Sequence, residues 1–213
     1  MSRSISTSST SQTEQGVAWP TGTAALAGGC LLAVFYITHA ALAIGLLDGR
    51  PGPFWQAMFL AESVGLLLIM LSVPGWCSPR SSVSGFALIG AVLLSGGLLI
   101  WALAGASNLT PDGQLPIPTP TWLYTALVAV GSPIVAATCL RTHNTPVGAV
   151  ILVGVCGLLG MVLLATPEWV YALSGLDIDW PVPPLPGELV LALYAFAWSW
   201  AGQANRLTSR KVN

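Results

Sequence analysis

Charged residues are scarce in this chain. Only 7% of its 213 residues are Asp, Glu, Lys or Arg, whereas 54% are hydrophobic. Soluble domains carry about 25% charged residues, because their surfaces must be hydrated. So few charges cannot cover a globule, but they suffice for helices whose outer surface meets lipid. The composition therefore disfavours an ordinary soluble domain and predicts an all-α, polytopic membrane protein.

Lysine is nearly absent, since Lys211 is the single example, and the net charge is −1. Without a basic patch the chain attracts phosphate weakly, so we expect no nucleic-acid partner. No GxxxxGK[ST] loop occurs, and we therefore expect no nucleotide partner either. The position of Lys211 near the end of the chain also excludes an intramembrane lysine for a retinal Schiff base.

Cysteine and histidine are equally sparse, with four and two residues respectively. The cysteines form no CxxC pair and no zinc-type spacing, and they fit small buried hydrophobes better than ligands. A haem held by two histidines of one chain is disfavoured, because His143 falls in a predicted loop. The sequence thus predicts neither a metal nor a cofactor.

Long apolar runs are abundant. We predict six transmembrane helices, at residues 23–47, 53–73, 83–106, 121–140, 147–166 and 185–204. Each has about 20–25 residues, which at ~1.5 Å per residue crosses a hydrocarbon core of ~30 Å. Pro74 and Pro167 are expected to end the second and fifth helices, and Pro133 to kink the fourth.

Arginine and lysine are distributed unequally between the two sides of this six-helix bundle. If the N-terminus is inside, the outer loops hold only Arg50, whereas the inner segments hold Arg3, Arg80, Arg141, Arg206, Arg210 and Lys211. Positive residues favour the cytoplasmic side, so both ends are expected in the cytoplasm. An odd number of helices would place the ends on opposite sides and destroy the pattern.

One transmembrane domain accounts for most of the chain, over residues 21–206. A disordered cytoplasmic tail at 1–20 and a short one at 207–213 are expected to flank it. The predicted outer loops are residues 48–52, 107–120 and 167–184. The Ala-, Gly- and Leu-rich composition, with more Arg than Lys, is typical of a multi-pass protein of a prokaryotic cell membrane.

Tryptophan is concentrated near the ends of the predicted helices, where its ring and its N–H suit the membrane interface. The outer group contains Trp55, Trp101, Trp122, Trp169 and Trp180, and the inner group Trp19, Trp76, Trp198 and Trp200. Small residues mark faces where helices can approach, as in the stripe Gly154, Gly157 and Gly160. These faces serve either internal packing or contact with a second copy or a partner membrane subunit.

Few polar residues lie deep in the predicted bilayer. His39 and Glu62 are both ~12–14 Å below the predicted outer surface, on antiparallel neighbouring helices. Depth permits them to meet, although rotation about each helix axis is not fixed. An ionised carboxylate at this depth is costly, so Glu62 must be protonated, paired or hydrated. Tyr36 and Ser63 are candidate partners, and these four residues form the predicted proton or ligand site.

Glu188 begins the sixth helix, where a carboxylate favours the positive end of the helix dipole, so we interpret it as a cap. Three functions remain open. A small-solute or proton-coupled transporter or channel would use the His39–Glu62 pair. A non-catalytic subunit or assembly protein would use packing faces and outer loops. A membrane-embedded lipid enzyme needs more convergent ionisable groups than the chain offers, so we favour no enzymatic activity.

Overall fold

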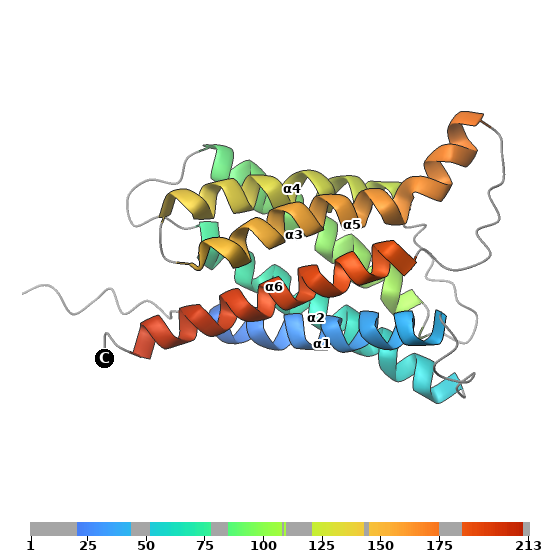
Figure 1. Cartoon of the computed structure of the whole chain (residues 1–213), viewed down its shortest axis with the longest axis horizontal. Helices are drawn as coiled ribbons and strands as arrows, with labels where there is room; N and C mark the ends of the chain where they lie inside the picture. Colours follow the sequence, from blue (N-terminus) through green and yellow to red (C-terminus); the bar gives the residue numbers. More distant parts are fainter. Residues whose placement is uncertain are drawn as a thin grey trace, which may run out of the picture.

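The computed structural model describes residues 21–43, 52–77, 85–107, 109, 121–142, 145–174 and 185–210. These residues form six helices and no strand (Figure 1): α1 (Thr21–Ala43), α2 (Gly52–Cys77), α3 (Gly85–Ser107), α4 (Thr121–Thr142), α5 (Val147–Ser174) and α6 (Leu185–Arg210). The all-helical prediction is confirmed for this part of the chain. The predicted tail at 1–20 and most of the three predicted outer loops lie outside it.

Two helices continue past prolines at which the sequence predicts an end. Helix α2 includes Pro74 and ends at Cys77, and α5 runs through Pro167 to Ser174. A proline removes one backbone hydrogen bond and crowds the preceding turn, so it bends a supported helix without necessarily ending it. The last turns of α5 lean away from the bundle in Figure 1. Residues 207–210, predicted as tail, form the last turn of α6.

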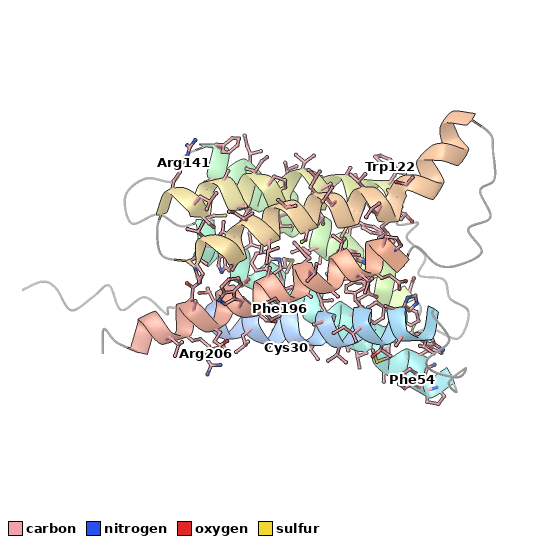
Figure 2. All side chains as sticks on the ribbon, viewed as in Figure 1. Cys30, Phe54, Trp122, Arg141, Phe196 and Arg206 are labelled. Atoms are coloured by element: carbon pink, nitrogen blue, oxygen red, sulfur yellow. The ribbon has the colours of Figure 1, made fainter. Side chains whose placement is uncertain are left out.

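The helices form a closed ring. Each helix packs against its neighbours in chain order, α6 closes the ring by packing on α1, and α2 also contacts α4. Consecutive helices alternate in direction, so the start of α1 and the end of α6 lie at the same end of the bundle (Figure 1). Arg141 and Arg206 lie at this end, whereas Phe54 and Trp122 lie toward the other (Figure 2).

Glycines allow the closest helix contacts. The predicted stripe on α5 meets α4 and α6, since Cβ atoms at Gly154, Gly157 and Gly160 would press on Ala136, Ser132 and Leu191. On the α1–α6 contact, a Cβ at Gly202 would lie 2.5 Å from the carbonyl oxygen of Gly22. Small residues therefore serve internal packing here, as in other lipid-embedded bundles.

The exterior of the bundle is apolar. Large side chains such as Ile37, Leu88, Val92 and Phe196 each expose more than half of their surface. Soluble monomers rarely expose apolar patches larger than a few hundred Å², so an exterior of this kind fits lipid. Helices α1 to α5 are each long and apolar enough to cross a membrane. The described chain is thus a helical bundle consistent with an integral membrane protein.

Helix α6 is less apolar than the others, because it contains Glu188, Ser199 and Gln203. Much of α6 is covered by protein, and Tyr194 and Trp198 have no exposed surface. Polar and aromatic groups on this helix can therefore be accommodated by neighbouring helices.

Of the tryptophans whose side chains the structure describes, Trp55 is half-buried and the other five divide into two groups. Trp122 and Trp200 are 56% and 40% exposed, as expected for residues at a membrane interface. Trp76, Trp101 and Trp198 are buried in the bundle, so their positions near helix ends reflect interior packing. Position along a helix predicts depth, but it does not distinguish the lipid face from the interior.

Candidate functional site

Glu62 is held by side chains from two other helices. It lies on α2, and only 6% of its surface is exposed. Its Oε1 accepts a hydrogen bond from the Tyr36 hydroxyl of α1, at 3.2 Å. The Trp101 indole of α3 donates a second hydrogen bond to the carboxyl group. Such donors reduce the cost of burying a carboxyl group, which reaches several kcal/mol for an unpaired charge.

The backbone of α3 passes close to Glu62 because residue 105 is glycine. A Cβ at Gly105 would lie 2.9 Å from Ser63 Oγ and 3.2 Å from Glu62 Oε2. Ser63 is buried, and its hydroxyl has no hydrogen-bond partner among the described residues. The absence of a side chain at Gly105 therefore provides the space in which both polar groups sit.

His39 on α1 pairs with Glu188 in the first turn of α6. The distance from His39 Nδ1 to Glu188 Oε1 is 2.5 Å, and the two side chains are 33% and 6% exposed. Within the described residues, the second carboxyl oxygen, Glu188 Oε2, is buried without a partner. The His39 ring stacks on Phe35 and meets Trp55 edge-on, with ring centroids 5.8 and 5.6 Å apart. The pair joins α1 to α6 near the end of the bundle opposite the described chain ends.

The two carboxyl groups belong to one electrostatic network. Tyr36 interacts with Glu62 and Glu188, and His39 also interacts with both. His39 lies ~6 Å and Tyr36 ~10 Å along α1 from its end at Ala43, at ~1.5 Å per residue. We name the following residues the polar cluster: Tyr36, His39, Glu62, Ser63, Trp101 and Glu188.

The polar cluster has more acidic than basic groups. Glu62 and Glu188 supply two carboxyl groups, and His39 is the only basic side chain that the structure describes in this half of the bundle. Arg141 and Arg206 lie at the other end (Figure 2). With all three groups ionised, the cluster carries a net charge of −1, which is unfavourable in a buried site.

Aromatic residues fill the interior in the other half of the bundle, toward Arg141. Trp76 of α2 and Trp198 of α6 have ring centroids 4.4 Å apart. The hydroxyls of Tyr194 on α6 and Ser132 on α4 lie 3.3 Å apart. These four residues, which we name the aromatic layer, join three alternate helices across the ring. They separate the polar cluster from the end of the bundle that carries Arg141.

A groove of about 420 Å³ follows the outer side of the α1–α6 contact. Cys30 and Phe196, which lie on this side in Figure 2, contribute to its lining with Leu26, Ala33, Val34, Ser199, Trp200 and Gln203. None of these residues belongs to the polar cluster. The groove is therefore a feature of the apolar exterior and is separate from the candidate site.

The structure distributes the predicted site residues over two connected pairs. The sequence suggests that His39 meets Glu62, whereas the described hydrogen bonds join His39 to Glu188 and Glu62 to Tyr36. Ser63 lies beside Glu62 without a hydrogen-bond partner in the described part of the chain. Glu188, interpreted from the sequence as a helix cap, lies in the first turn of α6, and it is also a partner of His39.

The sequence does not reveal the site roles of three residues. Glu188 stands out in the sequence as an acid at the predicted membrane boundary, but its contact with His39 depends on closure of the ring. Trp101 resembles an interface anchor in the sequence, and Gly105 resembles any small residue near a helix end. Contact between helices determines all three roles.

No group of three or more His, Cys, Asp or Glu side chains that could hold a metal ion occurs among the described residues. No family of known proteins, no curated protein and no solved structure matches this chain. The functional argument therefore depends on the geometry and charge of the polar cluster.

Proposed function

We propose that this chain is a six-span protein of a prokaryotic cell membrane, with both ends in the cytoplasm. It moves protons, or a small solute coupled to protons, through the polar cluster. Helix α6 is the sixth span, because Leu189, Leu193 and Phe196 present an apolar exterior face despite its polar interior groups. The position of Arg141 and Arg206 at one end of the bundle supports a cytoplasmic location for that end.

The excess of buried acid in the polar cluster is the observation that carries this proposal. When His39 and Glu188 form an ion pair, Glu62 needs one further proton for the cluster to be neutral. The Tyr36 and Trp101 donors can bond Glu62 whether its carboxyl group is ionised or protonated, since an acceptor oxygen remains in both forms. Glu62 can therefore gain and lose a proton with little rearrangement, as a coupling site requires.

Proton movement through purified protein in liposomes tests this function. A pH step across vesicles that contain a pH-sensitive dye should give a faster internal pH change than in protein-free vesicles. Glu62→Gln cannot ionise at residue 62, and His39→Ala removes the partially exposed base. We expect each variant to lower the rate at least tenfold, a barrier increase of about 1.4 kcal/mol.

Glu168→Gln is the matched control, because it makes the same chemical change on α5, a helix that contributes no residue to the polar cluster. It should retain the rate of the unmodified protein. Unchanged proton movement in correctly inserted Glu62→Gln and His39→Ala would exclude the polar cluster as the path.

A reporter protein fused after Asn213 tests the topology. A reporter that functions only in the cytoplasm should be active. If only a reporter that functions outside the cell membrane is active, the proposed orientation is contradicted.

A non-catalytic membrane subunit or assembly protein is the second candidate. The aromatic layer favours this second function. Trp76, Tyr194 and Trp198 fill the half of the bundle through which a solute would have to leave. This function requires a stable protein partner that co-purifies in mild detergent. Recovery of the chain alone, together with proton movement in liposomes, would decide for transport.

A further inference from the structure

Two oxygen atoms of the polar cluster are buried without a hydrogen-bond partner among the described residues: Glu188 Oε2 and Ser63 Oγ. Both residues are only 5% exposed. Buried polar atoms are nearly always paired, and an unpaired one often marks a bound ion, water or ligand. Glu188 Oε2 is the stronger indication, because an ionised carboxylate is an acceptor only and attracts positive charge.

The charge of the surroundings indicates what this oxygen binds. Among the described residues, the ionisable groups of the network are Tyr36 and His39 of α1, Glu62 of α2, Tyr124 of α4 and Glu188 of α6. With both tyrosines neutral, the ionised cluster is short of one positive charge. A proton supplies that charge, and so does any small monovalent cation. A divalent ion would leave a buried surplus of one charge, which is again unfavourable.

We propose that the polar cluster binds a small monovalent cation at Glu188 Oε2 in exchange for a proton. This inference rests on the proton-binding part of the proposed function and adds a class of substrate to it. In the exchange, the cation enters, the O–H bond of protonated Glu62 breaks, and the proton leaves to water. The net charge of the cluster stays at zero throughout.

Glu188 lies close to the end of the bundle. It lies three residues after the start of α6, ~5 Å along the helix, and its partner His39 is 33% exposed. The aromatic layer therefore does not lie between this end of the bundle and the carboxylate. An alkali ion and a small protonated amine share the required charge. Carboxylate oxygens suit the first, and the neighbouring aromatic rings of Trp55 and Phe35 suit the second.

Proton release from the purified full-length protein tests the exchange directly. Sodium chloride or methylammonium chloride is added to the protein in weakly buffered detergent, and a pH indicator measures the protons released. N-methyl-D-glucamine chloride, whose cation is bulky, controls for ionic strength. We expect release that saturates at about one proton per chain, since the cluster lacks one charge. Release by sodium, by methylammonium or by both supports the site and identifies which cation it accepts.

Variants assign the release to particular residues. Glu188→Gln removes the proposed ligand, and Glu62→Gln removes the charge deficit, so each should abolish release. Glu168→Gln should retain it. Size-exclusion chromatography and helical circular dichroism show whether each variant is folded. No release from the unmodified protein with either cation, or full release from folded Glu188→Gln, would overturn the proposal.

The cation site and the transport function can fail separately. Cation-evoked proton release without proton movement in liposomes would support the site and count against transport. Proton movement without cation-evoked release would overturn the cation site while leaving proton transport intact.

Discussion

Replacing Gly29 with alanine should force α1 and α6 apart. A Cβ at Gly29 would collide with Ser199 Oγ and would lie 2.5 Å from the carbonyl oxygen of Ala195 and 2.6 Å from the backbone nitrogen of Ser199. Two of these three atoms belong to the backbone and cannot rotate away. Ordinary contact begins at 3.4 Å, so the helices must separate locally by about 1 Å in a tightly packed region.

The magnitude follows from three contributions. Overpacking of this kind typically costs about 1–3 kcal/mol. Strain on the His39–Glu188 pair adds about 0–1 kcal/mol, because His39 is one-third exposed and its charge is partly screened. Alanine in place of a helical glycine stabilises the helix by roughly 0.5–1 kcal/mol, which offsets part of this loss. The net loss lies between about 0 and 3.5 kcal/mol, and its central value of about 2 kcal/mol corresponds to a fall in Tm of roughly 4–8 °C for a chain of this size.

Thermal unfolding of the purified protein in detergent measures this loss. Gly96→Ala on α3 is the matched control, since nothing lies within 4 Å of its added Cβ. The control should gain only helix propensity and should melt at or slightly above the temperature of the unmodified protein. If Gly29→Ala melts as high as Gly96→Ala, the close α1–α6 contact, and with it the closed ring, would be refuted.

Other perturbations test the site and the packing. Tyr36→Phe should cost about 1 kcal/mol by removing the hydrogen bond to Glu62, and strict additivity with Glu62→Leu, which has no acceptor, in a thermal double-mutant cycle would contradict this contact. Gly105→Ala should displace the Glu62 carboxyl and slow proton movement in liposomes, whereas equal rates in Gly105→Ala and Gly96→Ala would contradict the close approach. N-ethylmaleimide in detergent should modify one thiol rapidly, at exposed Cys30, and rapid modification of a second would contradict burial of Cys77, Cys139 and Cys156.

The sequence predicts how deep a residue lies more reliably than which way it faces. Apolar length and proline positions place His39 and Glu62 at similar depth, and the structure brings both into one polar cluster. Their partners depend on rotation about each helix axis, which is fixed by contacts such as that of Gly105 with Ser63. A periodic pattern cannot supply this rotation, because all six helices are apolar on the side that faces lipid as well as on much of the side that faces protein.

Closure of the ring creates the candidate site. His39 and Glu188 are 149 residues apart in sequence, and they meet only because the first and last helices lie side by side. In an open row of the same six helices, Glu188 would lack His39 and would face either lipid or a different partner, with an unpaired carboxylate near the membrane boundary. The glycine contacts between α1 and α6 therefore contribute more than packing energy. They bring the second acid to the cluster and so produce the charge deficit on which the proposed proton and cation binding depend.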